Sequence, residues 1–180
     1  TLLGLSAMPT DHPLNVGMVG MHGNYGPNVL TNECDVLIAL GMRFDDRVTG
    51  NLATYAKQAK VIHFEIDSAE VDKNVKTTVA VLADLKESLT ALLPLIEKNS
   101  HESWHNEFKE KYKIELEAVI NDELKPKKEG ISMGETIEMI NKHSKGDAIM
   151  VSDVGQHQMF TCRYSKFNQT KSNITSGGLG

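Results

Sequence analysis

The chain of 180 residues has few cysteines, no long apolar run and no excess of positive charge, and each absence excludes a class of protein. Its two cysteines, Cys34 and Cys162, lie far apart and form no CxxC pair, so we expect neither a disulfide framework nor a zinc site. No apolar stretch reaches the roughly 20 residues that a membrane-spanning helix needs. The net charge of -5, without a basic stripe, argues against nucleic acid as a partner.

Apolar residues make up 40% of the chain and fall into short runs that alternate with helical patterns. Strands are predicted over 35–41, 60–67 and 78–83, and helices over 24–33 and 84–96, the second with Asp84 as its N-cap. This alternation predicts an α/β fold with a doubly wound parallel sheet of the Rossmann type.

The second half begins with a highly charged segment over 97–128, which predicts one or two connecting helices. We expect Pro126 to end this segment, among the lysines of a solvated linker. A capping box of Ser132 and Glu135 predicts the start of a helix that runs to about residue 141. A strand over 148–153 and a strand-to-helix junction are predicted after it. The apolar face of the charged segment is expected to comprise Trp104, Phe108, Tyr112, Leu116 and Ile120, and the linker lysines are Lys125, Lys127 and Lys128.

The most informative segment is GMRFDDRVTG over 41–50, which follows the first predicted strand. In an open α/β sheet, ligands bind at the loops that leave the carboxyl ends of the strands. Two arginines beside two aspartates can hold an anion and also fix each other's orientation. An isolated cluster of this kind is more often a solvated turn, but its position directly after a buried strand favours a binding site.

Acidic residues follow the next two predicted strands, Glu65 the second and Asp84 the third. Each could accept a hydrogen bond from a ribose hydroxyl or simply cap the following turn, and the sequence leaves both possibilities open. With Arg43 at the end of the first strand, the three residues are expected to line one edge of one sheet, as in a nucleotide cleft. The glycine-rich turn over 20–26 precedes a helix and could admit a diphosphate, although His22 alone indicates only a turn histidine.

Gln156 and His157 stand where the predicted strand over 148–153 gives way to a helix. Their amide and imidazole groups could bind phosphate oxygens or cap the helix, and the segment alone favours neither. His157 has no neighbouring Ser or Cys nucleophile, so no catalytic triad is indicated. Core packing is the expected role of Cys162.

Three segments in fixed order, GMVGMHG at 17–23, GMRFDDRVTG at 41–50 and DVGQHQM at 153–159 with SGGLG at 176–180, resemble the catalytic large subunit of the acetohydroxyacid synthases, also called acetolactate synthases. The resemblance covers nearly the whole chain. It implies a thiamine-diphosphate enzyme that also carries FAD, as a structural group, and condenses two 2-oxoacids with loss of carbon dioxide in branched-chain amino acid synthesis. It further implies a central FAD-binding domain over 1–96, a helical linker over 97–129 and the start of a thiamine-diphosphate domain over 130–180.

The resemblance also assigns individual residues to the two cofactors and to a substrate channel. Those near thiamine diphosphate are Gly155, Gln156 and His157 at its diphosphate and Gly180 at its pyrimidine. The substrate channel, where inhibitors of the family bind, includes Met21, Asp46 and Arg47. The residues expected at FAD are Thr1, Leu2, Met21, His22, Gly23, Gly41, Arg43, Asp45, Val48, Glu65, Ile66 and Asp84.

By the same resemblance, the glutamate that activates thiamine diphosphate belongs to an amino-terminal domain, and the ligands of Mg²⁺ follow Gly180. The chain is therefore expected to be part of a longer protein, to be inactive alone, and to contain neither a catalytic acid or base nor a metal ligand. The implied partners are 2-oxoacid substrates, further large subunits in a dimer or tetramer, and a regulatory small subunit, but no nucleic acid or membrane. The implied location is the cytoplasm in a bacterium or an organelle in a eukaryote.

Two alternatives remain open at this point. One is another thiamine-diphosphate enzyme, such as a glyoxylate carboligase or a pyruvate oxidase. The other is a nucleotide-binding module without catalytic activity.

Overall fold

A computed structural model describes residues 1–126 and 129–177, so the predictions made for Lys127, Lys128 and Gly180 lie outside the described residues. The chain forms two compact units, unit 1 over Thr1–Asn28 and Ser103–Gly180 and unit 2 over Val29–Glu102. The predicted domain limits at 96 and 129 concern the longer protein and stay a prediction.

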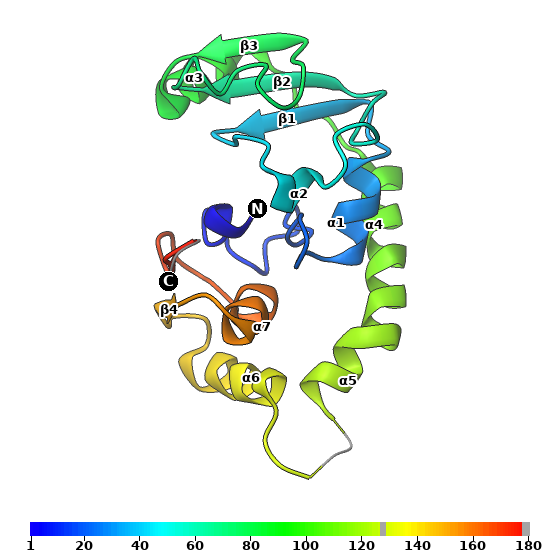
Figure 1. The fold of residues 1–180 in the computed structure, drawn as a ribbon, viewed down its shortest axis with the longest axis vertical. Helices are drawn as coiled ribbons and strands as arrows, with labels where there is room; N and C mark the ends of the chain where they lie inside the picture. Colours follow the sequence, from blue (N-terminus) through cyan, green and yellow to red (C-terminus); the bar gives the residue numbers. More distant parts are fainter. Residues whose placement is uncertain (127–128, 178–180) are drawn as a thin grey trace. The chain divides into compact units, whose positions relative to one another are not determined.

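Unit 2 is built on a three-stranded parallel sheet with the strand order β1-β2-β3 (Figure 1). The strands are β1 (Val36–Leu40), β2 (Lys60–Glu65) and β3 (Val79–Leu82). The register pairs Leu40 with Phe64, and all strands run in the same direction. The carboxyl ends of the three strands therefore meet at one edge, which confirms the predicted α/β class with a parallel sheet.

Short helices precede, connect or follow the strands of unit 2. They are the end of α1 (Tyr25–Thr31), which crosses from unit 1, then α2 (Asp46–Thr49), α3 (Leu85–Leu92) and the 3-10 turn η2 (Leu93–Leu95). Asp84 is the N-cap of α3, as predicted. This helix was predicted to reach residue 96. Its α-helical part ends at Leu92, and the 3-10 turn η2 continues it to Leu95.

The core of unit 2 lies between β1, β2 and the segment that follows α2. It consists of Ala39, Phe44, Tyr55, Ala56 and Val61. The side chain of Phe44 enters this core from the loop after β1, so the first residues of the candidate site are fixed by the core beneath them.

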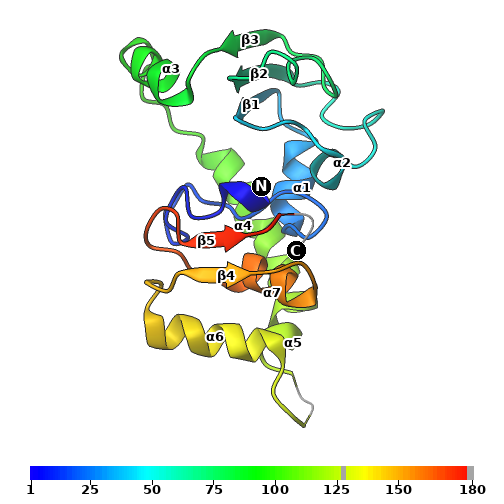
Figure 2. The same ribbon diagram turned by 60° about the vertical axis from the view of Figure 1, so that its left-hand side comes forward.

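Unit 1 contains the remaining helices and a pair of parallel strands, β4 and β5 (Figure 2). Helix α7 packs against α6 and β4. The elements in chain order are η1 (Leu2–Gly4), α4 (Glu102–Glu115), the π-helical turn η3 (Leu116–Ile120), α5 (Asn121–Leu124), α6 (Met133–Ser144), β4 (Met150–Ser152), α7 (Gln156–Tyr164) and β5 (Asn173–Thr175).

Helix α6 begins with the predicted capping box. The Ser132 hydroxyl accepts from the Glu135 N–H at 3.1 Å, and the Glu135 carboxylate accepts from the Ser132 N–H at 2.9 Å. The helix continues to residue 144, beyond the predicted 141, and ends at Lys145 in the left-handed conformation with φ of 53°. This reciprocal cap satisfies two N–H groups that would otherwise lack helical partners.

The charged segment forms a helix, but the apolar face predicted for it is wrong in part. Tyr112 is 52% exposed, whereas Glu115 is buried at 4% exposure. The buried face runs through Glu115, directly before the π-helical turn η3, and Ile120, the last residue of that turn and five positions later. An i to i+5 turn brings such residues onto one side, where a regular α-helix would not. None of the described helices is long and apolar enough to cross a membrane.

Candidate functional site

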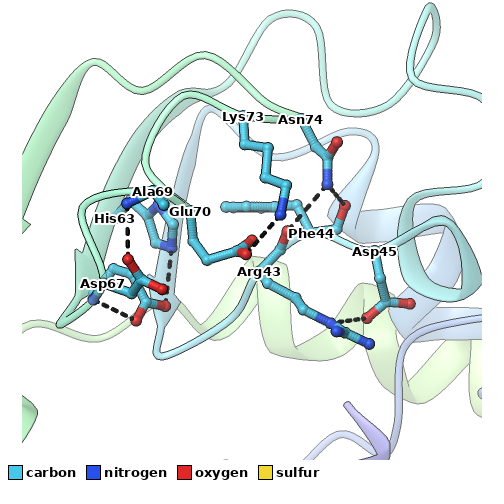
Figure 3. Close-up of polar contacts among 10 residues, drawn as sticks. Arg43, Phe44, Asp45, His63, Asp67, Ala69, Glu70, Lys73 and Asn74 are labelled. Carbon is cyan, nitrogen blue, oxygen red and sulfur yellow. Dashed lines mark hydrogen bonds and ion pairs between the residues drawn. The ribbon is translucent and has the colours of Figure 1, made fainter. Parts of the chain in front are cut away.

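The loop after β1 has two residues in the left-handed conformation and is restrained by Asn74 (Figure 3) and by the core around Phe44. Gly41 adopts φ of 59° and Phe44 adopts φ of 54°, both in the left-handed region. The Asn74 side-chain amide donates to the carbonyls of Arg43 at 3.3 Å and Phe44 at 3.0 Å. A left-handed conformation costs a non-glycine residue free energy and persists only where its surroundings fix it. Asn74 and the core around Phe44 provide that restraint.

The restrained loop directs charged groups to the sheet edge. The Arg43 guanidinium is 73% exposed, and its Nε lies 3.7 Å from the Asp45 carboxylate. Asp45 also caps α2, because its Oδ1 accepts from the Arg47 N–H at 3.0 Å. Asp46 and Arg47 form a second, exposed pair at 3.3 Å, and Val48 is half-buried in the same helix. Exposed pairs of this kind contribute little to stability, so the Arg43 guanidinium remains available to an anion.

The Phe44 ring connects the ends of β1 and β2. It is 1% exposed and meets the His63 imidazole edge-to-face with a centroid distance of 5.1 Å, and the Tyr55 ring at 6.3 Å. Burial raises the pKa of Tyr55 to about 12. Aromatic pairs in such geometry are favourable beyond the area they bury. The two neighbouring strand ends thus share one aromatic cluster.

Glu65 ends β2, and its carboxylate contacts the main chain that follows the strand and His63 within it. Its Oε1 accepts from the N–H groups of Ile66 at 2.8 Å and Asp67 at 3.2 Å. Its Oε2 lies 3.8 Å from Nε2 of His63. His63 is fully buried, and within the described part of the chain neither of its ring nitrogens has a hydrogen-bond partner. The carboxylate is therefore fixed in position, with Oε2 as its remaining acceptor.

The segment after β2 adds further fixed carboxylates. Asp67 accepts from the Ala69 N–H at 2.9 Å, and Glu70 pairs with Lys73 at 2.6 Å. Asp72 accepts from both the N–H and the hydroxyl of Thr77, and these hydrogen bonds lower the pKa of Asp72. These contacts shape the loop that carries Asn74.

The third strand end shows the capping geometry that the sequence left open. Asp84 Oδ1 accepts from the N–H groups of Lys86 at 2.9 Å and Glu87 at 3.1 Å. Ile66, by contrast, exposes most of its side chain. Of the residues that the sequence singled out in unit 2, Gly41, Arg43, Asp45, Glu65, Ile66 and Asp84 follow or end the strands at the carboxyl edge of one sheet, whereas Val48 lies in helix α2.

In unit 1, the glycine-rich turn closes tightly on itself. The Gly23 N–H donates to the Gly20 carbonyl at 2.9 Å, and a Cβ at Gly23 would lie 2.3 Å from the Met18 carbonyl oxygen. Only glycine fits there without displacing the backbone. The turn leaves Met21 exposed and His22 half-buried. Thr1 and Leu2, also half-buried, belong to the first turn of the chain at η1.

The start of α7 is the second candidate position in unit 1. Gly155, its N-cap, has φ of 151°, and a Cβ there would lie 2.9 Å from the His157 ring. Among the described residues no side chain caps this helix, and Gln156 and His157 are exposed at its first turn. Gln158 anchors the helix by donating to the Thr175 hydroxyl of β5 at 2.7 Å. Uncapped N–H groups at a helix N-terminus attract an anion.

Chemically, the described residues provide two positions that accept anions, one at the Arg43 edge in unit 2 and one at the N-terminus of α7 in unit 1. No group of three or more His, Cys, Asp or Glu within 1–126 and 129–177 could hold a metal ion. Sequence reasoning missed His63, Asn74, Glu115 and Arg163. His63 belongs to β2 and Asn74 follows it, and no sequence motif marks either residue. Glu115 and Arg163 are partners of each other that lie far apart in the sequence.

Comparison with known proteins gives matches over the whole chain. The family model "Thiamine pyrophosphate enzyme, central domain" matches residues 1–92. The acetolactate synthase large subunit of Lactococcus lactis is 44% identical over 100% of this chain and 31% of its own length. A probable acetolactate synthase large subunit of Methanocaldococcus jannaschii is 40% identical, with 100% and 31% covered. The chloroplastic acetolactate synthase 2 of Zea mays is 36% identical, with 100% and 28% covered. The chain thus spans about a third of the length of these relatives.

Proposed function

The chain belongs to the thiamine pyrophosphate enzyme family, and from that premise we propose that it is part of the large subunit of an acetolactate synthase. The enzyme would condense two 2-oxoacids with loss of carbon dioxide, either two pyruvates or pyruvate with 2-oxobutyrate. The observation that carries the proposal is the order of the GMRFDDRVTG and DVGQHQM segments in a chain that large subunits match over its full length at 36–44% identity.

We propose that residues 1–96 form most of a central domain that binds FAD. The exposed Arg43 guanidinium fits a phosphate group of such a ligand, since its ion pair with Asp45 is long, at 3.7 Å. Glu65 fits a ribose hydroxyl through Oε2 alone, because two main-chain N–H groups occupy Oε1. The remaining FAD contacts would come from the residues that the family resemblance names, among them His22 and Asp84.

We propose that Gly155, Gln156 and His157 hold the diphosphate of thiamine diphosphate. The uncapped N-terminus of the nine-residue helix α7 fits this group, because its N–H groups and its dipole favour negative charge. When bound, this cofactor supplies the carbanion chemistry of 2-oxoacid decarboxylation and condensation. The chain's own part is to bind and orient, with Gln156 and His157 at the diphosphate and Met21, Asp46 and Arg47 along a substrate channel.

The proposal extends to the parts and partners that the family implies. The activating glutamate and the Mg²⁺ ligands would lie in the remaining two-thirds of the subunit. Large subunits would associate as a dimer or tetramer and bind a regulatory small subunit. The location would be the cytoplasm of a bacterium or an organelle of a eukaryote.

The full-length protein tests the proposal directly. Purified protein is supplied with FAD, thiamine diphosphate and Mg²⁺, freed from excess flavin and incubated with pyruvate, with and without 2-oxobutyrate. We expect retained flavin, acetolactate from pyruvate alone, and acetohydroxybutyrate when both substrates are present. The same protein without thiamine diphosphate is the control and should form neither product.

Other outcomes identify the alternatives. Condensation of glyoxylate but not of pyruvate would indicate a glyoxylate carboligase. Pyruvate consumption that depends on an electron acceptor and yields no acetolactate would indicate a pyruvate oxidase. Retention of flavin without any product, under all these conditions, would favour a binding module.

A further inference from the structure

A buried ion pair in unit 1 joins two elements that the function proposed above assigns to different cofactors. Arg163 lies in the last turn of α7, and its side chain is 18% exposed. Its Nη2 pairs with Glu115, which is 4% exposed, and its Nη1 donates to the Gly23 carbonyl at 3.1 Å. Its Nε donates to the Tyr164 hydroxyl at 3.0 Å. All three nitrogens of the guanidinium are therefore engaged.

Glu115 holds the glycine-rich turn from a second side. Its Oε2 accepts from the Asn24 side-chain amide at 3.4 Å. The same Asn24 side chain accepts from the Met18 N–H at 3.0 Å, so it also closes the turn internally. Two consecutive residues of the turn, Gly23 and Asn24, are thus bound by the two members of one ion pair.

The pair is placed so that a shift of one element moves the other. Arg163 stands seven residues after Gln156, which is two turns of one helix, so a fixed last turn also fixes the first. A cavity of about 180 Å³ lies beside the pair, and its walls include Met21, His22, Phe160 and Arg163. Glu115 itself directly precedes the π-helical turn η3, a feature that recurs at functional sites.

Stability alone does not account for this arrangement. A buried ion pair loses its hydration, and apolar residues of similar volume often replace such a pair without loss of stability. Apolar residues could not, however, bind the Gly23 carbonyl and the Asn24 amide at the same time.

We propose that Arg163 and Glu115 are positioning residues that couple the binding of FAD at the glycine-rich turn to the binding of thiamine diphosphate at the start of α7. The coupling rests on the function proposed above. Ordering of the turn by one ligand holds Arg163 in place and thereby orders α7 for the other. Such coupling is reciprocal, so each cofactor must raise the affinity for the other by the same factor.

The test measures four dissociation constants in the full-length protein. Flavin fluorescence gives the Kd of FAD with and without thiamine diphosphate and Mg²⁺, and calorimetry gives the Kd of thiamine diphosphate, in the presence of Mg²⁺, with and without FAD. For the unaltered protein we expect each Kd to fall about 5- to 150-fold when the other cofactor is present, the usual range for coupled sites. In the double variant Glu115→Leu/Arg163→Met we expect a ratio near one, in a protein that still unfolds in a single cooperative transition.

The matched control is the exposed pair Glu110 and Lys113 on α4, whose nitrogen and oxygen lie 2.6 Å apart. The same exchange there, Glu110→Leu/Lys113→Met, should leave the coupling intact. Arg163→Lys provides a second probe in case the double variant fails to fold. It keeps the charge but not the fork that reaches three acceptors, and it should reduce the coupling at least threefold.

The outcomes separate this inference from the proposed function. If the unaltered protein binds both cofactors without mutual effect, or if the double variant or Arg163→Lys retains full coupling, the inference is overturned while the proposed function stands. If the unaltered protein binds neither cofactor, both fall. Loss of coupling in the folded variants, together with intact coupling in the control, supports the inference.

Discussion

Replacing Phe44 by alanine should loosen the whole loop that carries Arg43, because this one ring fixes the loop to the core. The ring is 1% exposed and packs on His63 and Tyr55 at centroid distances of 5.1 and 6.3 Å. Alanine has a Cβ, as phenylalanine does, so the left-handed conformation with φ of 54° costs the alanine variant the same free energy. The substitution therefore removes packing and leaves the backbone strain in place.

The magnitude follows from these two terms. Truncation of a fully buried phenylalanine costs about 3–5 kcal/mol. Phe44→Gly loses the same ring but relieves about 1–2 kcal/mol of left-handed strain. Glycine also loses more conformational entropy on folding than alanine does, which destabilises the glycine variant by about 0.5–1 kcal/mol. The glycine variant should therefore be more stable than the alanine variant by roughly 0–1.5 kcal/mol, the interval between these opposing terms.

Hydrogen exchange in the full-length protein measures this locally. The N–H groups of Val48, Thr49 and Gly50 donate within α2 at 2.9–3.0 Å, so their exchange reports opening of the loop. We expect Phe44→Ala to accelerate exchange over residues 41–50 about 100-fold or more, at 1.4 kcal/mol per factor of ten. Asp46→Asn, an exposed change in the same loop, should alter it less than threefold. Unchanged exchange in a folded Phe44→Ala variant, or faster exchange in Phe44→Gly than in Phe44→Ala, would refute the reasoning.

Three further changes test the site and its surroundings. Arg43→Ala should raise the Kd of FAD roughly 10- to 100-fold, because a charge-assisted hydrogen bond contributes about 1.5–3 kcal/mol; flavin fluorescence titration measures it, and full flavin retention would argue against the placement. Gln156→Ala should weaken thiamine diphosphate binding about tenfold by loss of one hydrogen bond and leave FAD binding, measured without thiamine diphosphate, within twofold; equal loss of both would indicate misfolding. Burial raises the pKa of Tyr55 to about 12, so its contribution to stability is complete below the unfolded-state pKa near 10 and is lost as the pH rises toward 12. Tyr55→Phe should abolish this pH-dependent part of the unfolding free energy, roughly 2–3 kcal/mol for a shift of two pKa units. Unfolding experiments between pH 9 and 12 measure it, and an identical pH dependence in both proteins would contradict the prediction.

The sequence predicted the elements of this fold closely because their signals are local. The three strands of unit 2 begin and end within two residues of their predicted limits, since buried parallel strands consist of short apolar runs between turn residues. The caps at Asp84 and Ser132 were predicted for the same reason, because a capping residue contacts N–H groups only two or three positions away.

The candidate site was predictable only as a set of strand ends. Parallel pairing guarantees that residues after β1, β2 and β3 meet at one edge, and the structure confirms that placement. It does not determine what each side chain contacts. Glu65 bonds its own main chain, Asp84 caps α3, and Arg43 alone presents a largely free charge. These differences arise from hydrogen bonds and packing that no residue pattern specifies.

Three of the residues that the sequence did not reveal, Asn74, Glu115 and Arg163, have partners that lie far along the chain. Glu115 belongs to a helix that was expected to pack an apolar face and to expose its charges, and its partner Arg163 is 48 residues away. A charged residue is seldom buried unless it is paired, so the burial of Glu115 follows only once folding has brought Arg163 beside it. The π-helical turn after Glu115 also interrupts the regular period of 3.6 residues on which the prediction of the apolar face relied. Periodicity can therefore locate such a helix, but it cannot show which of its charges faces inward.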